Sequence, residues 1–394
     1  MPVQENFLVF FGTKTHRVVE NCATEAGIYI RVRTYYCVYL PLMKFIPRIF
    51  FILLLAAALL PSCKTDFEVY APEKEIRVVY CILNPADTVQ YVRIAKAFQF
   101  KGDAIAFAGA NDLSVKNLDV KLIGNGVTYH AIEMNDIPKD SGMFYPVHTL
   151  YKFVTDSSGP GKQKLAKGET YRLEIGTSDA GDYITGETSI PTSPKIKGSL
   201  SLQAGAGNTK CVPRLALDDA FILTFDQGTG KAFEVRVYFD YFENGQPRQS
   251  MWGPSFPFRE SRGCISGAGQ LCYSFSQGEL VSFFKQYMPS GPVYSYDRSD
   301  SCVTVGVVSL DSLAKPIRFE VTAMDEYLGN YIEVNNPAFE DLSGTKPEYT
   351  NLTGNIEVIG IFGSISKDWK GAILQPCPEW QLGLNFTPKP PDCQ

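Results

Sequence analysis

Histidine is scarce in this chain: there are three among 394 residues, and only His130 and His148 lie beyond residue 62. A Ser-His-Asp triad needs a histidine held by both partners, and no G-x-S-x-G segment is present to supply the nucleophile. C-x2-C spacing is also absent, which argues against a zinc site. We expect His130 in a hairpin strand and His148 in the loop-like segment 144–150, each exposed or half-buried. The sequence therefore predicts no catalytic residue, no metal ligand and no cofactor.

Charge is also sparse, at 20% of residues, and it is unevenly distributed. Residues 1–62 hold six basic and three acidic residues, so their net charge is +3, and the total of −5 leaves −8 for residues 63–394. An acidic body is a poor match for nucleic acid. Two acidic pairs could serve a glycosidase, Asp218-Asp219 and Asp325-Glu326. The first pair would point to opposite faces of a strand, and the second fits the first turn of a helix.

The prominent apolar run, Ile49–Leu60, has only about a dozen residues, whereas a membrane-spanning helix needs about 20. Lys44 and Arg48 precede this run, and it ends in the letters LPSC. A basic start, a short apolar core and a small residue before a cysteine are typical of a bacterial lipoprotein signal. We therefore expect residues 43–62 to be a signal peptide and Cys63 to carry lipid such as palmitate. The alternative is a buried helix that happens to precede a cysteine.

A signal peptide works at the start of a chain, so residues 1–42 need a separate explanation. The simplest is that translation begins at Met43 and that residues 1–42 are an upstream extension from a misassigned start. The alternative is a genuine cytoplasmic leader. After the signal, residues 63–73 are polar and predict a tether, and residues 376–394 form a tail that contains proline and cysteine.

Short alternating segments separated by turn residues dominate the rest of the chain and predict a mainly β protein. We expect an immunoglobulin- or fibronectin-like β-sandwich over residues 74–195 and a second β-rich domain over residues 196–375. The expected strands are 76–83, 89–98, 119–123, 127–132, 171–175 and 183–190 in the first domain, and 221–225, 233–239, 302–310, 317–324 and 356–362 in the second.

Two helices should interrupt the second domain. Ser276 with Glu279 three residues later predicts a capping box that opens a helix over residues 277–287. Residues 325–334 place their apolar side chains on one side and predict the other helix. The stretch 246–270 is long and rich in Gly, Pro, Ser and aromatic residues, and loops of that length often bind a ligand or are disordered.

Seven cysteines follow Cys63, and an exported protein meets an oxidising compartment where they can pair. Cys81 lies inside an apolar strand and is expected to remain a free, buried thiol. The expected pairs are Cys264–Cys272 around a Gly-rich loop, Cys377–Cys393 in the tail and, as the weakest, Cys211–Cys302. Sequence alone proves none of them.

Three segments in order, EIRVVYCILNPADTVQYVRIAKAF, GETYRLEIGTSDAGDYITGETSIPTSP and PEYTNLTGNIEVIGIFGSIS, resemble a known family. The similarity is to Bacteroidota outer-membrane lipoproteins described only as domain-of-unknown-function family 4249, and it covers most of residues 63–394. The resemblance implies an accessory role beside a TonB-dependent transporter, and it supplies no active site. The cysteine-containing tail departs from the family pattern.

Two further sets of residues are candidate sites. Trp252, Phe256, Phe258 and Tyr273 cluster around the long loop and could stack on sugars or anchor a partner, although we favour the alternative that they cap the sheet as ordinary core. Thr88 and Ser312 follow aspartate and precede an apolar residue, the short pattern used for O-glycosylation in the group that the chain resembles.

The sequence thus predicts a non-enzymatic, lipid-anchored outer-membrane protein that binds a partner or ligand for a TonB-dependent transporter. One alternative is an envelope hydrolase acting on glycan or peptide, and another is a structural or adhesive surface protein. The interrupted charges of Lys64, Asp66 and Glu68 just after Cys63 favour the outer leaflet and the cell surface.

Overall fold

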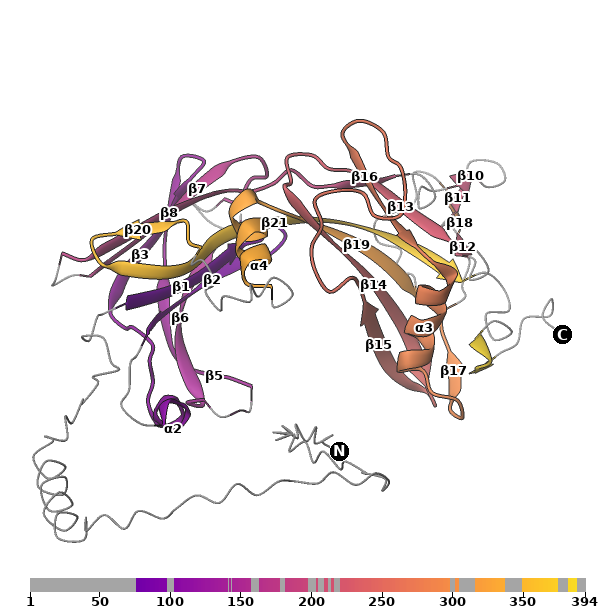
Figure 1. The fold of residues 1–394 in the computed structure, drawn as a ribbon, viewed down its shortest axis with the longest axis horizontal. Helices are drawn as coiled ribbons and strands as arrows, with labels where there is room; N and C mark the ends of the chain where they lie inside the picture. Colours follow the sequence, from indigo (N-terminus) through magenta and orange to yellow (C-terminus); the bar gives the residue numbers. More distant parts are fainter. Residues whose placement is uncertain are drawn as a thin grey trace, which may run out of the picture. The chain divides into compact units, whose positions relative to one another are not determined.

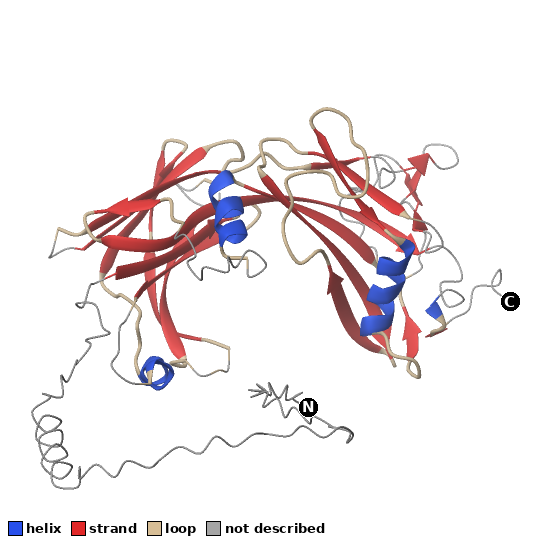
Figure 2. Cartoon of the chain, in the orientation of Figure 1, coloured by secondary structure: helices blue, strands red, loops and turns tan. Residues whose placement is uncertain are grey.

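The structure is a computed structural model that describes residues 76–97, 103–140, 142, 144–156, 163–177, 181–197, 203–204, 209–211, 214–215, 220–297, 302–304, 316–336, 349–374 and 382–387. Within these ranges the chain is mainly β, as the sequence predicted (Figure 2). The described helices are α2 (Ala104–Ala110), α3 (Gln277–Tyr287) and α4 (Glu326–Val334). The signal segment and Cys63 lie outside the described residues.

The first β-sandwich packs two sheets around one core (Figure 1). One sheet contains β1 (Ile76–Leu83), β2 (Val89–Lys96), β6 (Val147–Val154) and β5 (Ile132–Pro138). The other contains β20 (Leu352–Gly354), β8 (Tyr183–Ser189), β7 (Thr170–Thr177), β3 (Leu118–Gly124) and β4 (Val127–His130). Strand alternation sends Val79 and Phe153 inward from one sheet and Leu173 inward from the other, and all three are fully buried.

A second core, rich in phenylalanine, lies under another pair of sheets and α3. One sheet contains β15 (Gln246–Trp252), β14 (Ala232–Glu243), β19 (Ile317–Met324), β17 (Val293–Ser295) and β22 (Asn385–Phe386). The other contains β16 (Gln270–Phe275), β13 (Phe221–Asp226) and β9 (Lys195–Lys197). Phe225, Phe239 and Phe284 are each at most 1% exposed in this core. The remaining short strands are β10 (Gln203–Ala204), β11 (Thr209–Cys211), β12 (Arg214–Leu215) and β18 (Cys302–Thr304).

One long strand, β21 (Glu357–Leu374), belongs to both sandwiches. Residues 357–364 pair in parallel with β1, and residues 365–372 pair antiparallel with β19. The short strand β20 just before it pairs with β8 of the first sandwich. The sheet pairing is therefore continuous across the expected boundary at residue 195, and the division into two domains stays a prediction.

The helices show how closely local signals set element bounds. Ser276 accepts a hydrogen bond from the Glu279 backbone, and the Glu279 side chain accepts one from the Ser276 backbone, so the predicted capping box is confirmed. Asp325 is the residue before α4 rather than part of its first turn, and its side chain accepts from Leu328 N at 2.8 Å.

Three expectations about loops and strand ends were wrong. His148 lies in β6 and not in a loop, because Thr149, Tyr151 and Phe153 alternate inward there. The stretch 246–270 begins with β15, which pairs along the second half of β14. The strand expected over residues 356–362 continues to Leu374, because its second half finds partners in a different sandwich.

Candidate functional site

The segment after β15 is the candidate binding loop, and two neighbouring strands hold it in place. Phe258 and Phe233 exchange both backbone hydrogen bonds at 2.8 Å, which fixes the loop to β14. Arg262 N donates to Cys272 O at 2.9 Å, and Ser274 N donates to Arg262 O at 2.9 Å, which fixes it to β16. Because these bonds tie down the backbone, the loop presents a fixed surface.

The candidate aromatic residues divide between the core and this surface. Phe258 is 3% exposed and Tyr273 is 7% exposed, and their ring centroids lie 5.8 Å apart. Trp252 packs against the same core, with its ring 6.5 Å from that of Tyr273. Phe258 and Tyr273 are therefore core residues and Trp252 is partly buried against the same core, which agrees with the favoured interpretation. Phe256 is only half-buried and lines a cavity.

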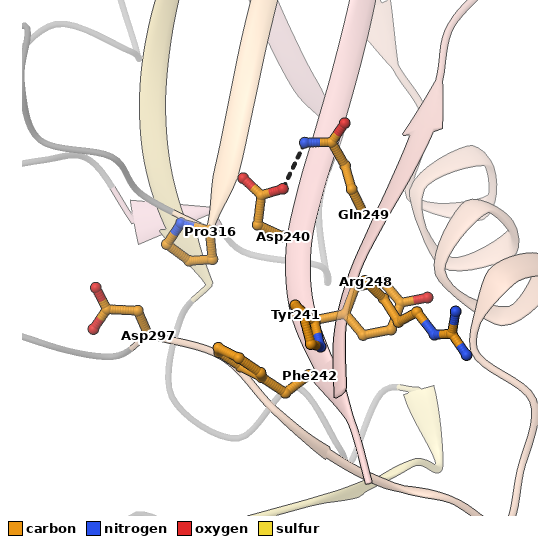
Figure 3. Close-up of a pocket in the computed structure, with 8 residues that line it drawn as sticks. Asp240, Tyr241, Phe242, Arg248, Gln249, Asp297 and Pro316 are labelled. Carbon is orange, nitrogen blue, oxygen red and sulfur yellow. Dashed lines mark hydrogen bonds between the residues drawn. The ribbon is translucent and has the colours of Figure 1, made fainter. Parts of the chain in front are cut away.

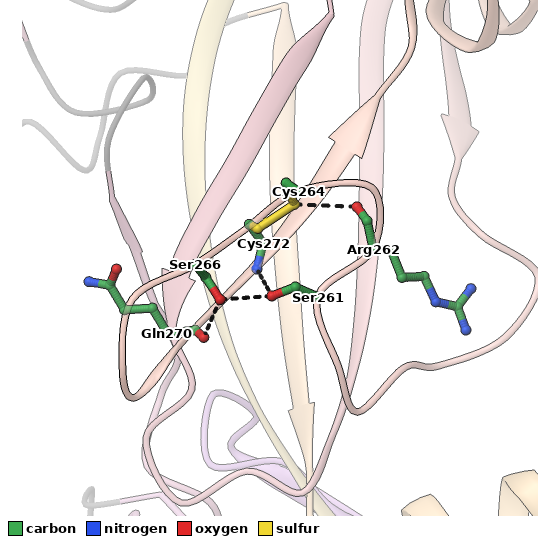
Figure 4. The surroundings of a disulfide bond; sticks show 6 residues. All are labelled: Ser261, Arg262, Cys264, Ser266, Gln270 and Cys272. Carbon is green, nitrogen blue, oxygen red and sulfur yellow. Dashed lines mark hydrogen bonds between the residues drawn. A yellow bond between two sulfur atoms is a disulfide. The ribbon is translucent and has the colours of Figure 1, made fainter.

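A disulfide closes the tip of the loop, between the two cysteines that the spacing paired (Figure 4). The Cα atoms of Cys264 and Cys272 lie 6.1 Å apart, within the range for this bond. Ser266 Oγ donates to Gln270 O at 2.8 Å and lies 2.8 Å from Ser261 Oγ, which accepts from Cys272 N at 3.1 Å. Each hydroxyl has a single proton, and Ser266 uses its proton for Gln270 O, so Ser261 is the donor to Ser266. The Gly-rich turn is therefore held by hydrogen bonds as well as by the disulfide.

Replacing Cys264 and Cys272 together with serine should lower the free energy of unfolding by roughly 2 kcal/mol, because the short loop regains freedom mainly in the unfolded chain. Urea unfolding measures the change. Cys81→Ala provides the control, since this free thiol is buried in the other core and closes no loop. Equal urea midpoints for the wild type and the double variant would contradict the stabilising role of the bond.

The loop and α4 enclose a cavity of about 590 Å³. Its lining includes Phe256, Arg262 and Glu260 from the loop, and Ile332 from α4. Arg259 joins the two walls: its guanidinium donates to Glu333 Oε2 at 3.2 Å, to Asn330 Oδ1 at 2.6 Å and to Lys231 O at 3.2 Å. The side chain of Arg259 therefore connects the loop to α4 and holds the two walls of the cavity together.

Another cavity, of about 520 Å³, lies on the outer face of β14 and β15 (Figure 3). Asp240 comes from β14 and accepts from Gln249 Nε2 at 2.6 Å, and Asp297 follows β17. Phe242, 43% exposed, also lines the cavity. Two carboxylates at one cavity are the minimum that a glycosidase requires, so the alternative hydrolase hypothesis is best tested here.

Among the described acidic residues, Asp325 has the largest shift in pKa, and the sequence placed it at the start of a helix. It is 5% exposed, and burial raises its pKa from 3.8 to about 6. Thr188 Oγ1 donates to its carboxylate and also lies 2.9 Å from Ser364 Oγ, which donates to Ser189 O at 2.9 Å. This chain of hydroxyls connects β8, β21 and α4, so Asp325 has a structural role.

The remaining candidates are scattered. Thr88 is exposed in the turn between β1 and β2, where a modifying enzyme could reach it, whereas Ser312 lies outside the described residues. Cys211 and Cys302 are direct partners in the pairing of β11 with β18, so their backbones are adjacent, as a disulfide between them would require. Cys377 and Cys393 lie outside the described residues. Cys81 is free and buried, as predicted.

The histidines are separate from these cavities. His130 is exposed at the end of β4. His148 is half-buried, and burial together with the positive charges of Arg93 and Lys139 lowers its pKa. Over the described ranges, no three His, Cys, Asp or Glu side chains gather closely enough to hold a metal ion. No helix among those ranges has both the length and the apolar character to cross a membrane.

The family model described as "Domain of unknown function (DUF4249)" matches residues 64–370. The chain belongs to this family. Among the described strands, only the end of β21 and the strand β22 lie beyond the match. The region that defines this DUF4249 chain therefore includes strands of both sandwiches. A comparison with curated proteins finds no match.

The structure also explains glycines in the segment GNIEVIGIFG of this DUF4249 chain. Gly354 lies so close to β8 that a Cβ atom would approach Tyr183 O to 2.3 Å, and a Cβ at Gly363 would approach Leu328 Cβ to 2.8 Å. Because Gly354 has no side chain, β8 can lie close to β20. Because Gly363 has none, α4 can lie close to β21. The segment is thus a structural junction, which the sequence did not reveal.

Proposed function

We propose that this DUF4249 protein is a non-enzymatic, lipid-anchored protein of the bacterial outer membrane that binds a protein partner, with a TonB-dependent transporter as that partner. The segment of residues 43–63, with its basic start, short apolar run and terminal cysteine, carries the proposal. The disulfide between Cys264 and Cys272 supports it, because such bonds persist in oxidising compartments outside the cytoplasm.

The loop that ends in this disulfide is the proposed contact surface. It combines a half-buried aromatic side chain at Phe256 with charged side chains at Arg259, Glu260 and Arg262. Aromatic and arginine side chains on a rigid surface are typical of protein interfaces. The backbone bonds to β14 and β16 lower the entropy lost when the partner binds.

Replacing Cys63 with alanine should release the protein from the membrane fraction or leave it as uncleaved precursor, because a single thiol would carry the acyl chains. Cell fractionation and metabolic labelling with palmitate measure this. Cys81→Ala is the matched control, because it removes a buried thiol and should keep the label. Full membrane retention and full labelling of the Cys63→Ala protein would refute the anchor.

A photo-reactive benzoyl-phenylalanine in place of Phe256 should cross-link to a partner in the outer membrane of intact cells. The matched control is the same group in place of Tyr183, which is 54% exposed on the sheet of β8. Mass spectrometry of the Phe256 adduct then identifies the partner. A soluble envelope protein in the adduct would contradict the transporter assignment, and equal adducts at both positions would contradict the loop surface.

A further inference from the structure

A third cavity, of about 560 Å³, lies on the outer face of the first sandwich and goes beyond the proposed function. Its floor comes from β1 and β2, which turn Val78, Tyr80 and Ala95 away from the core. One wall is α2, with Ala108 facing inward, and another includes Phe144.

Backbone bonds hold these walls in place. Lys96 N donates to Leu113 O at 2.9 Å and Val115 N donates to Ile94 O at 3.0 Å, so residues 113–115 run along β2. Tyr145 N donates to Ala108 O at 3.0 Å, which ties the segment after Phe144 to α2. On the floor, Tyr331 Oη donates to Tyr80 Oη at 3.2 Å and restrains the Tyr80 ring. The cavity is therefore preformed, which favours ligand binding.

The polar lining of this cavity is positive, although the chain as a whole is acidic. Arg93, Lys96 and Lys139 line it, and no carboxylate does so among the described residues. No described carboxylate lies within ion-pair distance of Arg93 or Lys139. Asp112, the acidic residue whose charge reaches Lys139, is paired with Lys116 at 3.2 Å.

Two neighbours show the effect of this concentrated positive charge. Burial and the charge of Arg93 lower the pKa of Lys139, and Arg93 and Lys139 together contribute to the lowered pKa of His148. Arg93 and Lys139 have no ion-pair partner among the described carboxylates, and a bound anion would stabilise two such neighbouring cations.

We propose that this cavity binds a small organic anion whose acidic group lies between Arg93 and Lys139. The acidic group is a carboxylate or a phosphate, since both accept several hydrogen bonds from such cations. The body of the ligand is apolar or aromatic, because Val78, Tyr80 and Phe144 provide apolar and aromatic surface in the lining. Phe144 is 62% exposed, and a bound ring would cover it.

Isothermal titration calorimetry of the full chain with 2-naphthoate, 2-naphthyl phosphate, 2-naphthamide and inorganic phosphate tests the proposal. We expect the two aromatic anions to bind, the tighter of them identifying the acidic group. We expect 2-naphthamide, which lacks the charge, and inorganic phosphate, which lacks the ring, to bind at least about tenfold more weakly. Binding of 2-naphthamide as tight as that of 2-naphthoate, or no binding of either aromatic anion, would overturn the proposal.

The variant Arg93→Gln with Lys139→Gln should weaken binding of the tighter aromatic anion by about tenfold or more. The control, Arg248→Gln with Lys285→Gln, makes the same change in net charge on β15 and α3 and should leave the affinity unchanged. Equal weakening in both double variants would mean non-specific charge attraction and overturn the site. In the wild type, nuclear magnetic resonance should show a ligand-induced rise in the pKa of His148, and the absence of that rise would also overturn the site.

Discussion

Replacing Gly360 with alanine should destabilise the first sandwich by about 4 kcal/mol or more. Gly360 has a φ of 111°, which non-glycine residues rarely adopt, and a Cβ atom there would lie 2.0 Å from Val79 O. Because Val79 is the direct partner of Gly360 in the pairing of β1 with β21, the methyl group can only be accommodated by separating the two strands. Hydrogen exchange of β1 and urea unfolding followed by circular dichroism measure the loss.

The matched control separates strain in φ from steric conflict. Gly126 also has a positive φ, of 72°, but a Cβ there would meet nothing within 4 Å. Gly126→Ala should therefore cost only about 1 kcal/mol. If both alanine variants unfold at the same urea concentration, close contact between β1 and β21 does not explain the glycine.

The second large effect is a pH dependence that originates at Asp325. Burial raises its pKa in the folded protein from 3.8 to about 6, so the folded state holds this proton more tightly than the unfolded chain does. The stabilising contribution is complete below about pH 4 and is lost as the pH rises through about 6, with a size of about 3 kcal/mol. The protein should accordingly lose this part of its stability between pH 4 and pH 7.

The hydroxyl chain gives this proton a structural role. Thr188 has one proton and two acceptors, Asp325 and Ser364, so it can satisfy only one of them while Asp325 is ionised. A protonated Asp325 donates to Thr188, and Thr188 is then free to donate to Ser364. Protonation thus completes the sequence of hydrogen bonds that ends at Ser189 O.

Asp325→Asn removes the titrating group and keeps an acceptor for Leu328 N. The difference in unfolding free energy between wild type and this variant should change by up to about 3 kcal/mol from pH 4 to pH 7, as measured by urea unfolding. Glu326→Gln is the control, because Glu326 is exposed beside it. A wild-type-minus-variant difference that stays constant with pH would exclude Asp325 as the origin.

Local sequence signals predicted the strands and helices that form without distant pairing partners. The strand over residues 76–83 and the helix over residues 277–287 have the predicted bounds, because alternation and a capping box act within a few residues. β6 was missed, since one of its inward side chains is the polar Thr149 and Pro146 stands directly before the strand. The extent of β21 could not be predicted, because its polar second half becomes a strand only through pairing with β19.

The candidate sites followed the same division. The Cys264–Cys272 pair was predictable from spacing of eight residues around a Gly-rich turn. The cationic cavity was not, because Arg93 and Lys139 lie far apart in the chain and come together only when residues 113–115 and the segment after Phe144 fold against β2 and α2. Sequence patterns show which residues are close along the chain, whereas this site is formed by residues that become close only when the chain folds.

The parallel pairing of β1 with β21 has a consequence for the order of synthesis. Ile76 is among the first described residues to leave the ribosome, yet its partner Glu357 comes near the end of the chain. Until then, β1 has an open edge that can pair with other chains, and long-range pairing of this kind is slow to form. We therefore expect the newly made chain to need a chaperone and to aggregate when translation stops before β21.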